Sequence, residues 1–296
     1  MRAWLELIRL PAVFTAPADV LAGVALAGAA VATDAVRPFA VVLVVLASVA
    51  IYAAGMAAND LFDLEIDRHE RPFRPLPSGR IAVSAAWRLV VGLQVGGVAL
   101  AALASPAAAG ATAATVLATY AYNAKLKSTP VGPLSMGLCR YGNALIGISA
   151  VAGGSVLTAS STVLLLPLGT LLYVAAVTGI SRHEATGEVG PGLRASLVGL
   201  AVLSLHALFW LAVGLLSLPA LSALAIPVFL LGPVRRAWQG GAGPVRGAVM
   251  AGIFGIALVN ASVAAGTATP LGAGLAVAVV LCAALGRRVG RRMYST

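Results

Sequence analysis

Carboxylates gathered in two short polar stretches are the residues of this chain best suited to chemistry. Seven of its ten acidic residues lie there: five between residues 59 and 70, and Glu184 and Glu188 in the second stretch. Each stretch follows directly on an apolar run. Ionisable groups at a membrane boundary are costly and are expected where something highly charged must be held. The pattern indicates a site for a divalent metal and phosphate.

The spacing of the first stretch places its acids on one helix face. If the helix of residues 39–58 continues to about residue 67, Asn59, Asp63 and Asp67 form a row, because residues four apart are neighbours. Mg²⁺ prefers oxygen ligands and is typically held by one or two carboxylates plus substrate phosphates. Asp63 and Asp67 therefore suit a metal that bridges to a diphosphate. The alternative is a solvated helix end.

Cations accompany both stretches. Arginine binds phosphate through two parallel hydrogen bonds, and Arg74, in a proline-stiffened loop, is the predicted phosphate ligand. Glu184 and Glu188 are spaced for a second carboxylate pair on a continuous helix, unless Gly187 ends that helix first. Arg182 is an alternative diphosphate contact. Ordinary positive charge in a cytosolic loop remains the competing interpretation of the basic residues.

The rest of the chain is nearly continuous hydrocarbon. The 296 residues are 60% hydrophobic and 10% charged, with a mean hydropathy of +0.96. A soluble domain has about 25% charged residues, so this class is excluded. The composition predicts an all-α, polytopic membrane bundle in one domain, 1–296, with ten spans, or nine if one is interfacial or broken. The predicted spans are 11–32, 39–58, 81–104, 107–123, 134–156, 162–180, 195–216, 218–232, 247–266 and 271–286.

The net charge of +10 is a topology signal and not a nucleic-acid signal, because the basic residues fall between the spans. Long basic breaks at 59–80, 124–140, 181–194 and 233–246 alternate with short, nearly uncharged ones. The positive-inside rule places the basic breaks, and with them the acidic stretches, on the cytoplasmic side of the cell membrane.

One acidic residue lies inside a predicted span. Asp19 is about one turn beyond Pro17 in the first span, and such a group normally faces a cavity. We expect it to orient an acceptor hydroxyl or to act as a catalytic base. A hydrogen-bonded structural aspartate is the alternative. For Asn143, His206 and Asn260 we expect hydrogen bonds between helices.

The first stretch resembles the first aspartate motif of the UbiA superfamily of intramembrane prenyltransferases. The resemblance rests on Asn59-Asp60-x-x-Asp63-x-x-x-Asp67 followed by Arg74-Pro75-Leu76-Pro77-Ser78-Gly79. It implies about nine membrane helices around a central cavity, and transfer of an isoprenoid from its diphosphate to an acceptor with Mg²⁺. Carried over by position, it also implies that Mg²⁺-diphosphate is bound by Asn59, Asp60, Asp63 and Asp67, and the diphosphate by Arg74.

A second segment, Tyr120-Ala121-Tyr122-Asn123-Ala124-Lys125-Leu126-Lys127, resembles the family's Tyr/Lys segment after the fourth helix. There a lysine contacts the diphosphate, which implies binding roles for Tyr120, Lys125 and Lys127. The two lysines cannot be ranked from sequence.

The second acidic stretch departs from the family pattern, which is usually rich in aspartate. Here Ser181-Arg182-His183-Glu184 contains none and is similar to the divergent EboC-like branch. The resemblance implies prenyl transfer to an unidentified acceptor. A non-catalytic lipid-diphosphate binder or carrier on the same scaffold is the alternative. An unrelated secondary transporter fits poorly, because the acids lie at a helix end and not at the midplane.

Overall fold

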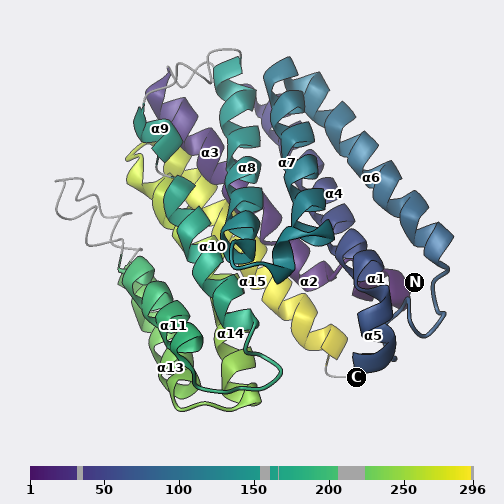
Figure 1. Ribbon diagram of the computed structural model, residues 1–296. Coiled ribbons are helices and arrows are strands. Elements are labelled where there is room, and N and C mark those ends of the chain that lie inside the picture. Colours follow the sequence, from purple (N-terminus) through teal and green to yellow (C-terminus); the bar gives the residue numbers. More distant parts are fainter. Residues whose placement is uncertain (32–35, 154–160, 166, 206–223, 295–296) are drawn as a thin grey trace.

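The computed structural model describes residues 1–31, 36–153, 161–165, 167–205 and 224–294, and these contain helices and loops but no strand (Figure 1). This confirms the all-α prediction. The helices are α1 (Arg2–Leu7), α2 (Leu10–Val13), α3 (Ala16–Ala30), α4 (Pro38–Phe62), α5 (Leu64–Glu70), α6 (Val83–Ala104), α7 (Pro106–Ala124), the short 3-10 helix η2 (Leu126–Ser128), α8 (Gly132–Ala152), α9 (Ser161–Leu165), α10 (Pro167–Ser181), α11 (Pro191–Ser204), α13 (Ala225–Trp238), α14 (Ala242–Gly266) and α15 (Pro270–Tyr294).

Each predicted span contains a helix in its described part. Among the described residues, six segments are long and apolar enough to cross a membrane: Leu10–Ala30, Pro38–Phe62, Val83–Ala104, Val163–Ser181, Ala242–Gly266 and Pro270–Gly290. The choice between nine and ten spans depends on residues 206–223, and so lies outside the described residues, as does His206.

Two helix boundaries differ from prediction because polar side chains continue an apolar helix. α13 extends to Trp238, so that Arg235 and Arg236 lie on its last turn and not in a loop. α8 begins at Gly132, so that Arg140 lies inside the bundle although we expected it in the basic break. A long arginine stem packs against apolar surface, and a buried guanidinium is tolerated when it is paired.

Helix α3 lies at the centre of the bundle and packs against α4, α8, α14 and α15. Small residues let it approach α8: a Cβ on Gly23 would lie 2.2 Å from the Ala144 carbonyl oxygen, and one on Gly147 would lie 2.1 Å from that of Val20. Such contacts are typical of membrane helices, where small residues let backbones meet. They fix the register that faces Asp19 toward α8.

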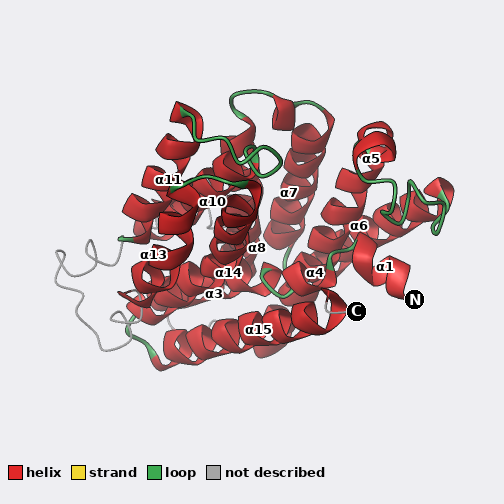
Figure 2. Ribbon diagram, turned by 90° about the horizontal axis from the view of Figure 1, so that it is seen from below, coloured by secondary structure: helices red, strands yellow, loops and turns green. Residues whose placement is uncertain are grey.

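The polar segments gather at one end of the bundle. In Figure 1 the N-terminus, α5, and the α10–α11 and α13–α14 connections lie at the lower end, whereas the α6–α7 turn lies at the upper end. The view from below places α11 and α13 on one side and α1, α5 and α6 on the other (Figure 2). The α10–α11 and α13–α14 connections, both predicted as basic breaks, therefore lie at the opposite end from the uncharged α6–α7 turn.

Candidate active site

The first acidic stretch is not one continuous helix. α4 ends at Phe62, Asp63 occupies the junction, and α5 begins at Leu64. The expected spacing nevertheless survives, because the Asp63 amide donates to the Asn59 carbonyl (3.0 Å) and the Asp67 amide donates to that of Asp63 (2.8 Å). The acids therefore remain about one turn apart along the chain.

Arg74, which the sequence analysis predicted to bind phosphate, contacts the carboxylates of the motif. Its guanidinium is 2.6 Å from Asp67 and 3.3 Å from Asp60. Both aspartates are buried, with exposed fractions of 2% and 4%. Arg71 is more distant, 4.0 Å from Asp67. Because the loop returns Arg74 to the helix that precedes it, one cation bridges two acids of the motif.

Arg9 is a second cation at the motif, and the sequence analysis missed it. Its guanidinium donates to Asp60 (3.0 Å) and to the Asn59 side-chain oxygen (3.4 Å). Arg9 has a left-handed backbone conformation (φ 51°) between α1 and α2, which bends the chain at this point. In the sequence it is one of two arginines before the first apolar run, and such a position by itself indicates only membrane topology.

The structure distinguishes the two lysines of the Tyr/Lys segment. The Lys127 ammonium forms an ion pair with Asp63, whereas Lys125 is exposed. Asn123 accepts a hydrogen bond from the Asn59 amide (3.0 Å) and so ties α7 to the acidic motif. Tyr120 donates to Gln94 (3.2 Å). Lys127 therefore joins the site directly, and Lys125 does not.

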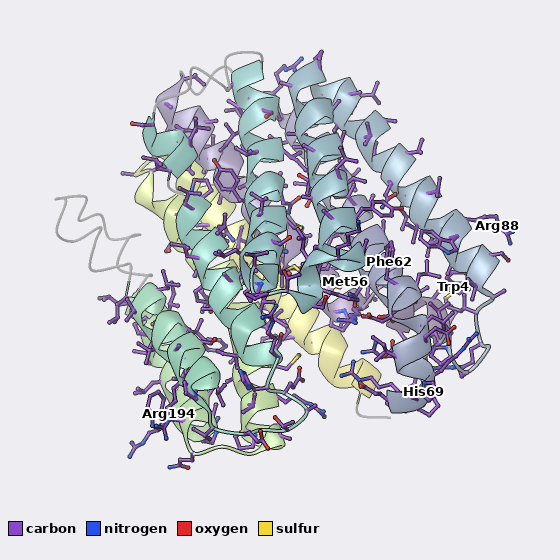
Figure 3. All side chains as sticks on the ribbon, in the orientation of Figure 1. Trp4, Met56, Phe62, His69, Arg88 and Arg194 are labelled. Carbon is purple, nitrogen blue, oxygen red and sulfur yellow. The ribbon has the colours of Figure 1, made fainter. Side chains whose placement is uncertain are left out.

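Aromatic rings pack directly beside the acidic motif. The ring of Tyr120 packs edge-to-face on Phe62, with 6.1 Å between centroids, and Phe62 packs in the same way on Trp87. Figure 3 places Met56 and Phe62 among the helices, whereas Arg88 and Arg194 extend outward at the two sides.

The second acidic stretch is not helical, which corrects the expected pairing of Glu184 with Glu188. α10 ends at Ser181, and Gly187 has a left-handed backbone (φ 65°). A Cβ on Gly187 would lie 2.3 Å from the Gly241 carbonyl carbon, so the close approach of two loops requires glycine there. Glu184 forms an exposed ion pair with Arg246 (3.2 Å), and Glu188 is exposed.

Arg182 contacts the lysine loop and not an acid. Its guanidinium donates to the carbonyl oxygens of Lys127 (2.9 Å) and Thr129. The start of α8 packs closely here, because a Cβ on Gly132 would lie 2.6 Å from the Arg182 guanidinium. Arg182 thereby links the end of α10 to the backbone that carries Lys127.

Asp19 is fully buried and lies in a polar centre inside the bundle. Its carboxylate pairs with Arg140 (2.8 Å) and accepts hydrogen bonds from Asn143 (3.1 Å) and Asn260 (2.8 Å). The Arg140 guanidinium also lies over the Tyr52 ring, 5.6 Å from its centroid. The amides bond between helices as the sequence analysis expected. Asp19 already has three polar partners, so its geometry gives no support to a role as catalytic base.

The oxygens of the first motif suit Mg²⁺ by chemistry, since carboxylate and amide oxygens are its usual protein ligands. In the described part of the chain, no group of three or more His, Cys, Asp or Glu side chains lies together in a ready arrangement for a metal. Instead each motif aspartate is paired with a cation: Asp60 with Arg9 and Arg74, Asp67 with Arg74, and Asp63 with Lys127. Metal binding at these acids therefore requires the cations to exchange partners.

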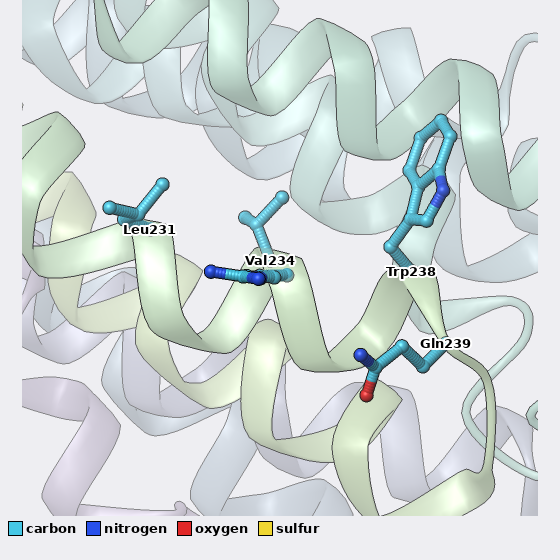
Figure 4. Close-up of a pocket in the computed structure, with 5 residues that line it drawn as sticks. Leu231, Val234, Trp238 and Gln239 are labelled. Carbon is cyan, nitrogen blue, oxygen red and sulfur yellow. The ribbon is translucent and has the colours of Figure 1, made fainter.

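A pocket on the outer face of α13 is separate from these groups. It has a volume of about 310 Å³ and is lined by Leu231, Val234, Arg235, Trp238 and Gln239 (Figure 4). It includes none of the motif residues, so its chemistry is not that of the acidic site.

Buried carboxylates and matched cations at one end of a bundle of apolar helices form a site suited to a metal ion and phosphate groups. The model of the UbiA prenyltransferase family matches residues 21–241, and the chain belongs to this family. This confirms the superfamily predicted from the first motif and makes the protein a UbiA-type prenyltransferase. Its placement in the EboC-like branch stays a prediction.

Similar proteins include the digeranylgeranylglyceryl phosphate synthase of Ignicoccus hospitalis, 32% identical over 234 residues that cover 74% of each chain. The Sulfurisphaera tokodaii enzyme of the same name is 35% identical over 52% of this chain and 55% of its own. Among solved structures, a UbiA homolog from Aeropyrum pernix K1 has a TM-score of 0.68 at 21% identity, covering 85% of this chain and 96% of its own. A UbiA homolog from Archaeoglobus fulgidus bound to GPP and Mg²⁺ has a TM-score of 0.61 at 19% identity, covering 88% and 99%.

Proposed function

We propose that this protein transfers a prenyl group from an allylic prenyl diphosphate to a membrane-soluble acceptor, with Mg²⁺ and the diphosphate bound at the first acidic motif. The observation that carries the proposal is the pairing of Asp60, Asp63 and Asp67 with Arg9, Arg74 and Lys127 at one end of a membrane bundle. The structure of a UbiA homolog from Archaeoglobus fulgidus is bound to GPP, a prenyl diphosphate, and Mg²⁺, which are the ligands proposed here. The positive-inside pattern favours a cytoplasmic location for this end.

Charge balance supports this ligand. Three carboxylates face three cations at the motif, so the site is close to neutral as it stands. A metal dication offsets most of the negative charge of a prenyl diphosphate, so binding both changes that balance little, since the metal meets the carboxylates and the phosphates meet the cations. Either ligand alone leaves uncompensated charge in a partly buried site, which is unfavourable.

The chain's own residues have separate tasks in the transfer. Mg²⁺, held by Asp60, Asp63, Asp67 and the Asn59 amide, would supply neutralisation of the diphosphate leaving group. Arg9, Arg74 and Lys127 turn from the carboxylates to the phosphate oxygens, where positive charge stabilises the departing diphosphate. Glu184 and Glu188 receive no support as metal ligands from their exposed positions.

The apolar interior protects the allylic carbon once the C1–O bond weakens. Phe62 and Tyr120 present aromatic rings beside the motif and are suited to stabilise developing positive charge. The face of Tyr52 is already occupied by Arg140. Because the prenyl tail lies among helices, water is excluded and the acceptor captures the carbon.

The acceptor class follows from the relatives and not from the site. Two similar proteins are named digeranylgeranylglyceryl phosphate synthases, so we infer a glyceryl phosphate lipid as the acceptor class. An aromatic acceptor is the outcome that would contradict this inference.

Diphosphate release is the measurement that tests the function. Purified protein in nanodiscs is given geranyl or geranylgeranyl diphosphate with a glyceryl phosphate monoether lipid, in Mg²⁺ or in EDTA. We expect release only with Mg²⁺ and acceptor, together with a prenylated lipid product. Tight Mg²⁺-dependent diphosphate binding without turnover on this lipid or on extracts of the native host would instead favour a lipid-diphosphate binder.

Replacement of Arg182 by alanine is expected to weaken prenyl diphosphate binding. The variant loses two hydrogen bonds that hold the Lys127 backbone, so Lys127 is less often placed at the site. We expect the KM for the diphosphate to rise about tenfold, from the loss of roughly one to two net hydrogen bonds. Steady-state kinetics measures it. Arg194→Ala is the matched control, because Arg194 stacks on Trp238 instead (5.6 Å). Equal effects of the two variants would contradict the role of Arg182.

A further inference from the structure

Two buried polar atoms on α8 have no hydrogen-bond partner among the residues that the structure describes: Asn143 Oδ1 and Arg140 Nε. Both side chains are buried, with exposed fractions of 5% and 6%. Arg140 Nε lies 2.8 Å from Asp19 Oδ2 as an ion pair, but its N–H is not aligned on any protein acceptor. Since buried polar groups nearly always have partners, two such atoms together indicate a further polar partner, either a water molecule or a group of a ligand.

The orientation of the Asn143 amide is fixed by its nitrogen. Asn143 Nδ2 donates to the Ala16 carbonyl (3.0 Å) and to Asp19 Oδ2 (3.1 Å). A flipped amide would set its oxygen against two oxygens, so Oδ1 must point away from both. Arg140 is held similarly, because its Nη2 donates to the Thr15 carbonyl (3.0 Å). The unpartnered acceptor and donor are therefore built into the network.

A hydroxyl group complements this pair. Asn143 and Arg140 are three residues apart and share a face of α8. Asn143 Oδ1 accepts a hydrogen bond and Arg140 Nε donates one, and a hydroxyl both donates and accepts. A carboxylate would be repelled by the lone pairs of Asn143 Oδ1, and an ammonium would be repelled by the Arg140 guanidinium. Neither group therefore fits as well as a hydroxyl.

A row of partly exposed residues on α4 extends from the acidic motif to the neighbourhood of Arg140. Among residues 51–60 of α4, only Tyr52, Met56 and Asn59 are partly exposed, and they form one row. Arg140 stacks over Tyr52 at one end of the row, and Asn59 bonds to Asn123 at the other. Seven residues of helix span about 10 Å, so the two ends of the row are about that far apart.

We propose that Arg140 Nε and Asn143 Oδ1, on α8, form a recognition site for the hydroxyl of the acceptor, beside the Tyr52 end of this row. The proposal rests on the proposed prenyl transfer. It makes Arg140 and Asn143 positioning residues that select an alcohol, and it leaves Asp19 the task of fixing their side chains.

Binding of a matched pair of lipids tests this site without turnover. The protein in nanodiscs is given Mg²⁺ and inorganic diphosphate. It then receives either a glyceryl phosphate monoether lipid with one free hydroxyl or its deoxy analogue, in which hydrogen replaces that hydroxyl. We expect the alcohol to bind about five- to a hundredfold tighter, because the analogue leaves buried polar atoms unpaired. This comparison needs only the wild-type protein.

Two variants complete the test. Asn143→Leu is expected to reduce the ratio of the two affinities to within about twofold while diphosphate binding persists. Asn260→Leu removes another amide from the same Asp19 but no unpartnered atom, so the ratio should remain. Equal binding of alcohol and analogue to the wild type, or an unchanged ratio in Asn143→Leu, overturns the site. Loss of Mg²⁺-dependent diphosphate binding in the wild type would instead overturn the proposed function.

Discussion

Asp63→Asn and Asp67→Asn are each expected to reduce prenyl transfer by at least about a hundredfold while the protein remains folded. Each substitution removes a negative charge from the proposed metal site, and it also removes the carboxylate that Lys127 or Arg74 contacts there. The amides keep the shape of the side chains, so helix packing should change little. Mg²⁺-dependent diphosphate release measures the loss.

A neighbouring acid provides the control for this prediction. Glu65 lies on the same short helix but is exposed and pairs with Arg68 (2.6 Å), away from the motif cations. Glu65→Gln is expected to retain activity within about twofold, since exposed ion pairs contribute little. Full activity in both aspartate variants, with Mg²⁺ still required, would show that neither aspartate binds the metal.

The second large effect concerns stability. Arg140→Met is expected to destabilise the folded protein by about 3–5 kcal/mol, because it leaves the fully buried Asp19 carboxylate without its cation. Reversible unfolding in mixed detergent micelles gives the free energy of unfolding.

A double substitution tests whether the ion pair itself is the source of this loss of stability. Replacing both members, Asp19→Leu with Arg140→Met, removes both charges, and we expect most of the lost stability to return. If the free energy of unfolding of the double variant falls by as much as the sum of the losses in the two single variants, the ion pair is not the source of the effect. Acceptor selection should stay impaired in the double variant, since Arg140 Nε is absent.

Local sequence patterns determined the membrane class and the first motif. Runs of about twenty apolar residues are typical of membrane-spanning helices. Backbone groups in lipid must form hydrogen bonds within their own helix, so the all-α bundle follows from composition. The spacing of Asn59, Asp63 and Asp67 predicted a row because helical neighbours are close in sequence. That row survives the break at Asp63, since the backbone hydrogen bonds on either side remain.

Contacts between distant segments were decided only by the tertiary structure. Arg9 meets Asp60 across 51 positions, and Arg140 meets Asp19 from α8. A single arginine near an apolar run has the same local pattern whether it faces solvent, phosphate or a buried acid. Lys125 and Lys127 likewise differ only in where the turn of η2 directs them.

The second acidic stretch shows the same limit. The sequence predicts a helical pair for Glu184 and Glu188 from their spacing, but α10 stops at Ser181. The approach of the α13–α14 turn to Gly187, and the hydrogen bond from the Gly241 amide to its carbonyl (2.9 Å), hold that loop open. Spacing along the chain determines which side chains share a face only where a helix exists, and at this end of the bundle packing between distant loops decides that.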